Sequence, residues 1–130
     1  MILRKGEVLI LKEEKISAGF ELTSGEKISK QKGDLFLTNQ RIVFEAVGGG
    51  LFSKKRITII DCPLESVANV SIEGFLSKKL VLQLPVKVSS EFQAFYSTPA
   101  AFRGEIECRV VFCVKNPAEW QEKIVQAIRE

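Results

Sequence analysis

Apolar and polar residues alternate along most of this chain, and this two-residue period constrains the fold more than any other feature. Alternation puts every second side chain on one face of a β-strand, so each run predicts a strand with one buried face. The alternating runs lie at residues 35–37, 42–44, 57–59, 68–72, 80–84 and 106–114. Residues 8–23 precede them and are rich in β-formers, as either one bent strand or two short ones. The chain therefore predicts a mainly β domain with seven strands, or eight if that first stretch is divided.

Short turns separate the predicted strands. Thr38-Asn39-Gln40-Arg41 lies between two alternating runs and predicts a tight hairpin, because asparagine tolerates the positive φ that a two-residue turn demands. Further reversals are expected at residues 48–50 and 73–74, where glycines gather. Strands that follow one another without intervening helices favour an antiparallel meander, which closes into a barrel or stacks into a sandwich to hide its edges.

The C-terminal segment changes to a helical period. Its apolar residues fall on one face of an amphipathic helix: Trp120, Ile124, Ala127 and Ile128. Asn116 is suited to cap this helix, Pro117 to occupy its first turn, and Glu119 to reach back to the cap. We expect the apolar face to plug one open end of the barrel.

Length and composition indicate one domain, residues 1–130. The chain has 130 residues, of which 45% are hydrophobic, so it can bury a single core. The apolar run at residues 8–11 is too short for a signal sequence or a membrane span. We therefore expect a cytoplasmic protein. A net charge of only +3 argues against nucleic acid as a partner, and the aromatic residues are not interleaved with the lysines as a stacking platform requires.

Residues that support catalysis or metal binding are missing from the sequence. There is no histidine, no Gly-x-Ser-x-Gly elbow and no phosphate-binding Gly-x-x-x-x-Gly-Lys loop. Cys62, Cys108 and Cys113 form no Cys-x-x-Cys pair, so we interpret them as reduced packing residues. We expect a non-catalytic protein without metal or cofactor.

Residues 85–104 show no clear strand alternation but are rich in rings. The aromatic residues of this segment are Phe92, Phe95, Tyr96 and Phe102. Two interpretations are open: a lid that packs these rings on the barrel, or an aromatic surface that binds a protein partner.

The hairpin region resembles a known signature. Residues 33–44, Gly-Asp-Leu-Phe-Leu-Thr-Asn-Gln-Arg-Ile-Val-Phe, are similar to the Gly-x-Leu-x-Leu-Thr-Asn-x-Arg pattern of GRAM and related pleckstrin-homology-like domains. The Gly6-Glu7 opening, residues 57–65 and the helix with Trp120 extend the resemblance over nearly the whole chain. The resemblance implies seven strands in two near-orthogonal sheets, a C-terminal helix, and non-catalytic binding of membrane lipids or proteins.

Two similar six-residue motifs indicate a binding surface. Gly-Leu-Phe-Ser-Lys-Lys at residues 50–55 is followed by Gly-Phe-Leu-Ser-Lys-Lys at residues 74–79. In a meander with a single first strand, both loops lie at the same end as the loop after that strand. The residues that would gather there are Lys27, Lys30, Lys32, Leu51, Phe52, Lys54, Lys55, Arg56, Phe75, Leu76, Lys78 and Lys79.

Cationic loops with apolar tips suit peripheral attachment to anionic membrane lipid, because lysines approach the phosphates while the tip dips below them. The competing interpretation is that the loops are merely solvated and that their apolar residues fold back onto the core. The alternative function is protein binding through the 85–104 segment or a barrel edge.

Overall fold

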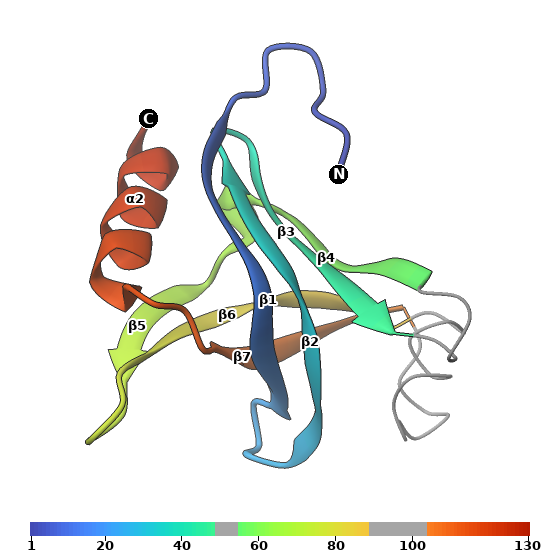
Figure 1. The fold of residues 1–130 in the computed structure, drawn as a ribbon, viewed down its shortest axis with the longest axis vertical. Helices are drawn as coiled ribbons and strands as arrows, with labels where there is room; N and C mark the ends of the chain where they lie inside the picture. The colour runs from blue at the N-terminus through green and yellow to red at the C-terminus, as the bar shows by residue number, and fades with distance from the viewer. Residues whose placement is uncertain (49–54, 89–103) are drawn as a thin grey trace.

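The computed structural model describes residues 1–48, 55–88 and 104–130 (Figure 1). Within these ranges seven strands form one antiparallel sheet, in the order β4-β3-β2-β1-β7-β6-β5. The elements are β1 (Leu9–Leu22), β2 (Lys27–Thr38), β3 (Arg41–Gly48), β4 (Lys55–Pro63), the 3₁₀ turn η1 (Leu64–Ser66), β5 (Asn69–Glu73), β6 (Lys79–Val88), β7 (Gly104–Phe112) and α2 (Pro117–Arg129). The predicted mainly β fold with seven strands and a C-terminal helix is confirmed.

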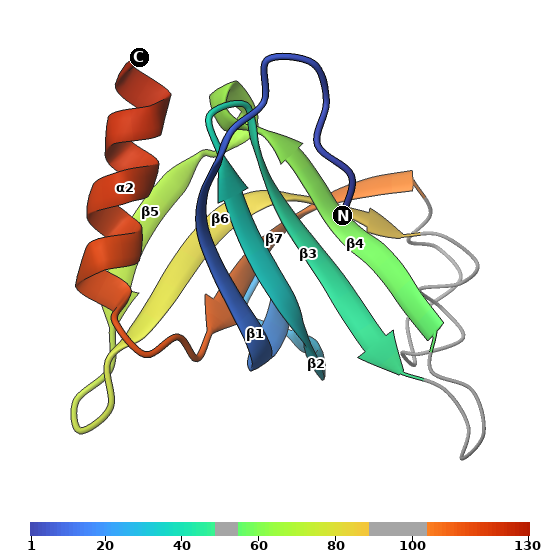
Figure 2. The same cartoon turned by 45° about the horizontal axis from the view of Figure 1, so that its top comes forward.

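Strand β1 is single, and it joins the two halves of the molecule. It pairs with β2 along most of its length and with β7 through residues 18–22. Its pairing with β2 shifts between Glu13 and Ile16, next to Lys15, which has a positive φ of 56°. This irregularity is typical of a bulge, which bends a strand. Because β1 is shared, the two crossing sheets implied by the resemblance form one continuous, strongly curved sheet, with β1–β4 running across β6 and β7 (Figure 2).

The core lies inside this curve. Rings from three strands meet at its centre, with centroids 6.2 Å apart for Phe20 and Phe44 and 5.7 Å apart for Phe44 and Phe112. Helix α2 packs against β5, β6 and β1 and buries Trp120, Ile124 and Ala127. Ile128, which we predicted on the buried face, is 40% exposed. At 100° per residue, position 128 falls at the edge of the apolar stripe.

The helix begins with the cap residue and the proline that the sequence predicts. The side chain of Asn116 accepts a hydrogen bond from the Glu119 amide at 3.2 Å, and Pro117 occupies the first turn. The indole Nε1 of Trp120 donates to Glu13 at 3.3 Å, which ties the helix to β1.

The β2–β3 hairpin is confirmed, but its predicted cause is wrong. Asn39 has no positive φ; among the described non-glycine residues only Lys15 does. The side chain of Asn39 accepts from the Val8 amide at 2.7 Å and donates to the Gly6 carbonyl at 3.1 Å. Asparagine is therefore used here for its hydrogen bonds to a neighbouring segment.

Two further expectations need correction. Strand β6 runs through Pro85 to Val88, so the segment without strand alternation begins later than expected. Proline has no N–H to donate, so within a sheet it is found where no neighbouring strand needs that hydrogen bond. Pro85 meets this condition because β5 pairs with β6 only as far as Gln83. Of the cysteines, Cys62 and Cys108 are buried, but Cys113 is exposed because it follows the end of β7 on the outer face.

Candidate functional site

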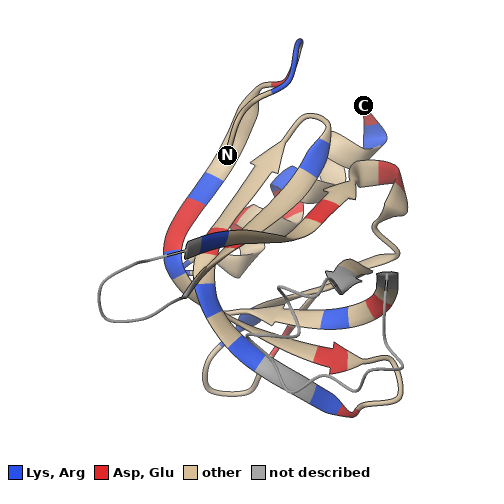
Figure 3. Cartoon of the chain, turned by 90° about the vertical axis from the view of Figure 1, so that its right-hand side faces the viewer, with Lys and Arg blue, Asp and Glu red and all other residues tan. Residues whose placement is uncertain are grey.

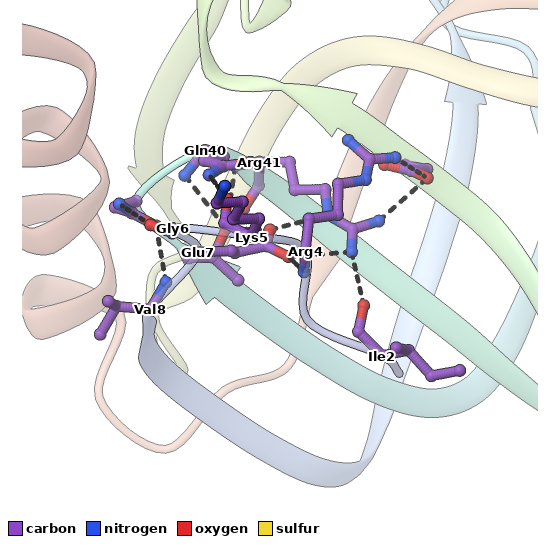
Figure 4. Close-up of polar contacts among 11 residues, drawn as sticks. Ile2, Arg4, Lys5, Gly6, Glu7, Val8, Gln40 and Arg41 are labelled. Atoms are coloured by element: carbon purple, nitrogen blue, oxygen red, sulfur yellow. Dashed lines mark hydrogen bonds and ion pairs between the residues drawn. The ribbon is translucent and has the colours of Figure 1, made fainter.

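The signature residues of the hairpin form a buried polar cluster (Figure 4). The Glu7 carboxylate accepts from Arg41 Nε at 2.8 Å, from Arg41 Nη2 at 3.1 Å and from the Thr38 hydroxyl at 2.7 Å. Arg41 also donates from Nη1 to Asp61 at 3.1 Å and from Nη2 to the Ile2 carbonyl at 3.0 Å. The cluster joins the segment before β1 to the β2–β3 hairpin and to β4.

The electrostatic interactions in this cluster favour the ionised forms of Glu7 and Arg41. The hydrogen bond from Arg41 lowers the pKa of Glu7 to about 2, against the opposing effect of burial. The same pair raises the pKa of Arg41. Because both side chains are buried and mutually satisfied, the signature residues act as a structural clamp and offer little surface to a ligand.

A second ion-pair cluster lies on the outer face of β2, β3 and β4. Arg56 donates to Asp34 and lies 3.7 Å from a Glu45 carboxylate oxygen. Burial raises the pKa of Asp34, but the hydrogen bonds from Arg56 and from the Lys15 amide, together with the positive charges of Arg56 and Lys12, outweigh it, and the pKa lies below its usual value. The charge of Arg56 is thus compensated locally, so Arg56 contributes less to a cationic surface than its place in the sequence indicated.

The β5–β6 turn projects two apolar side chains into solvent. Phe75 and Leu76 are each 93% exposed, so the interpretation that they fold back to cap the core is wrong. Gly74 allows this turn because its φ is +123° and a Cβ would lie 2.1 Å from the Ser77 carbonyl oxygen. Lys78 Nζ donates to the Gly74 carbonyl at 2.9 Å, which places a cation at the base of the tip.

The lysines that we assigned to the first loop are part of strand β2. Lys27 is its first residue, and Lys27, Lys30 and Lys32 are all exposed. Basic residues recur along this strand toward the β1–β2 turn (Figure 3). That turn and the β5–β6 turn project from the same, lower end of the molecule in Figure 1. We call Lys27, Lys30, Lys32, Phe75, Leu76, Lys78 and Lys79 the cationic end.

A hollow of about 430 Å³ joins these two hairpins on the outer face of the sheet. Its lining includes Lys27 and Lys30 from β2, Lys79 from β6, and Gly19 from β1. A neighbouring hollow of about 390 Å³ shares Lys79 and extends to Phe75. Sequence reasoning missed this arrangement because its lining comes from two pairs of strands, β1–β2 and β6–β7, that lie far apart in the chain.

An ion-pair network borders the hollow. Arg109 Nη1 lies 2.7 Å from Glu21, and Arg109 also pairs with Glu73. These residues occupy β7, β1 and β5, and no local pattern in the sequence indicated the network.

The remaining candidates lie outside the part of the chain whose side chains are described. These are Leu51, Phe52 and Lys54 between β3 and β4, Lys55 at the start of β4, and the aromatic residues Phe92, Phe95, Tyr96 and Phe102. Among the described residues, no group of three His, Cys, Asp or Glu side chains could hold a metal ion. No helix within those residues is long and apolar enough to span a membrane.

The sheet order, the curved seven-stranded sheet and the C-terminal helix define a pleckstrin-homology-like fold. Among solved structures, the chain is similar to the Vps36 N-terminal PH domain, with 22% sequence identity and a TM-score of 0.56. The similarity covers 98% of this chain and 83% of that chain. No protein-family model and no curated protein sequence matches. The similarity supports the fold.

Proposed function

We propose that this protein is a peripheral membrane-binding module that docks on anionic lipid through the cationic end. The observation that carries the proposal is the exposure of Phe75 and Leu76 at the tip of a turn that is followed at once by Lys78 and Lys79. Large apolar side chains at full exposure are costly in water and are typical of surfaces that insert into a membrane or bind a partner.

Charge and topology support the membrane as the partner. Strand β2, which carries these lysines, begins at the same end of the molecule as the β5–β6 turn, so the lysines and the apolar tip could meet one flat surface together. A basic residue near an anionic surface contributes about 1 kcal/mol. Burial of a Phe or Leu side chain contributes about 1.5–3 kcal/mol. Several such contributions, reduced by the cost of association, give reversible attachment in the millimolar to micromolar range.

Binding by vesicle co-sedimentation tests the proposal. The protein should sediment with vesicles that contain phosphatidylserine, remain in the supernatant with pure phosphatidylcholine, and lose binding as salt rises. If it stays in the supernatant with strongly anionic vesicles at low salt, the proposal is wrong. The exposed tip would then have to bind a protein partner, which is the alternative function.

A further inference from the structure

A groove of about 520 Å³ opens at the end of the molecule opposite to the cationic end. It is bounded by the C-terminal end of α2, the 3₁₀ turn η1 and the β2–β3 turn, which meet at the top of Figure 2. Its volume falls within the roughly 300–1,000 Å³ of typical ligand pockets. The described residues that line it include none from the cationic end, so the groove is a separate feature of the surface.

The groove has an apolar lining that is only partly covered. Leu64 and Ala127 line it and are nearly buried, while Ile128, which also lines it, is 40% exposed. Val8 is 61% exposed and lies beside the groove, because its amide donates to the side chain of Asn39, a lining residue, at 2.7 Å. Apolar surface left open in this way is typical of interaction sites. The groove can therefore receive an apolar side chain.

The charge around this apolar surface is negative. Glu65 and Glu130 line the groove, and neither forms an ion pair with the residues that the structure describes. Arg4 is the basic residue of the lining, and its guanidinium lies 3.4 Å from the Asp61 carboxylate.

The end of helix α2 adds to this negative charge. The last backbone carbonyls of a helix have no partner within it and attract positive charge. Arg129, the basic residue of the last turn, does not line the groove. A ligand with both apolar and positively charged groups is thus complementary to the groove.

We infer that this groove binds a peptide segment of a partner protein in which one large apolar side chain is flanked by lysine or arginine. The apolar side chain enters between Leu64 and Ile128, and the flanking cations approach Glu65 and Glu130. Because the groove lies at the end away from the cationic end, it stays accessible while the cationic end faces a membrane. The inference does not depend on membrane binding.

The test uses three pentapeptides with blocked ends. Gly-Lys-Phe-Lys-Gly has the chemistry of the inferred ligand. Gly-Glu-Phe-Glu-Gly keeps the apolar side chain and reverses the charge, and Gly-Lys-Gly-Lys-Gly keeps the charge and lacks the apolar side chain. The first should shift the amide NMR signals of Glu65, Ala127 and Ile128 and saturate in the millimolar range. Each of the other two should bind at least about fivefold more weakly.

Two variants of the protein locate the site. Glu65→Lys should weaken binding of the lysine peptide about fivefold, because it replaces an attraction with a repulsion. Glu122→Lys is the matched control, since Glu122 is exposed on α2 and does not line the groove. Ile128→Ser should weaken binding by a similar factor through lost apolar contact, and Phe75→Ser, at the other end of the molecule, is its control. Thermal unfolding verifies that each variant is folded; if Ile128→Ser is not, the comparison of Glu65→Lys with Glu122→Lys decides.

Three results would overturn the inference. The first is equal binding of the lysine and glutamate peptides, or equal effects of Glu65→Lys and Glu122→Lys. The second is the absence of saturable shifts at these amides up to about 10 mM peptide. The third is a shift of the same signals with protein concentration alone, together with a dimer in analytical ultracentrifugation, which would assign the groove to a second copy of this chain. Each of these results leaves the proposed membrane binding intact, because that function uses the opposite end of the molecule.

Discussion

The side chains of Glu7 and Arg41, which are 34 residues apart in sequence, form a two-point ion pair in the interior of the protein. Arg41 Nε and Nη2 donate to the two carboxylate oxygens of Glu7 at 2.8 and 3.1 Å. The Glu7 side chain is fully buried and that of Arg41 is 8% exposed. This pair fixes the segment before β1 on the β2–β3 hairpin, and it gives the signature threonine, asparagine and arginine a structural role.

Removal of one partner should strongly destabilise the protein. Glu7→Gln leaves the buried Arg41 with only part of its compensation, and loss of one partner of a buried pair costs about 3–5 kcal/mol. Urea unfolding measures this cost. Glu14→Gln is the control, since its pair with Lys12 is about half exposed and should contribute less than about 1 kcal/mol. Similar losses of stability for the two variants would contradict the structural role of the Glu7–Arg41 pair.

The same pair should make stability depend on acid pH. Arg41 lowers the pKa of Glu7 in the folded state to about 2, from an ordinary value of 4.5. A lowered carboxyl pKa contributes stability that is fully present above pH 4.5 and is lost as pH falls toward 2. Unfolding midpoints measured across this window should fall for the wild type and fall less for Glu7→Gln. Asp34, whose pKa is also lowered, supplies a residual slope in both proteins.

The local patterns in the sequence predicted the seven strands and the helix, but not the continuation of β6 to Val88. Alternation identified the strands because each has one face in the core, and the Asn116 cap was visible because its partner Glu119 lies three residues away. The sequence did not decide whether residues 8–23 form one bent strand or two, because a bulge at Lys15 has no reliable local signal.

The candidate site was predictable only in part. The sequence predicts that Lys27 and Lys78 lie at the same end of the molecule. In a meander, successive turns alternate between the two ends, so the order of the strands along the chain fixes the end at which each turn lies. The compensation of Arg56 by Asp34 and the lining of the hollow by Lys30 and Lys79 depend on contacts between distant segments. Such contacts require the register and curvature of the sheet, which one sequence does not supply.

Gly33 should be intolerant of any side chain. It pairs with Ala46 across β2 and β3, and a Cβ at position 33 would lie 2.3 Å from the Glu45 carbonyl oxygen and 2.8 Å from Phe44 Cζ. Gly33→Ala should therefore destabilise by about 1–3 kcal/mol, because the strands must separate. Chemical denaturation measures the loss. Gly19→Ala, with room for a Cβ, is the control and should change stability by less than about 1 kcal/mol.

Trp120 should contribute much of the energy that holds α2 on the sheet. Its side chain is 2% exposed and its indole N–H donates to Glu13. Trp120→Ala should cost about 3–5 kcal/mol, whereas Trp120→Phe keeps much of the packing and should cost about 1 kcal/mol for the lost hydrogen bond, plus a smaller packing term. Thermal and urea unfolding compare the two. A cost below about 1 kcal/mol for the alanine variant would show that the helix is loosely attached.

Salt should separate the two contributions to membrane binding. Lys78→Glu replaces an attraction with a repulsion near the anionic surface, at about 1 kcal/mol for each, so affinity should fall about thirtyfold at low salt. Because salt screens charges, this deficit should shrink as ionic strength rises. Phe75→Ser removes apolar burial of about 2 kcal/mol, so its deficit should also be about thirtyfold but should persist at high salt.

Lys5→Glu is the control for the charge change, since Lys5 lies beside Gln40 at the opposite end of the molecule. Co-sedimentation with phosphatidylserine vesicles over a salt series measures all three variants. Equal losses from Lys5→Glu and Lys78→Glu would mean that net charge, and not the cationic end, governs binding.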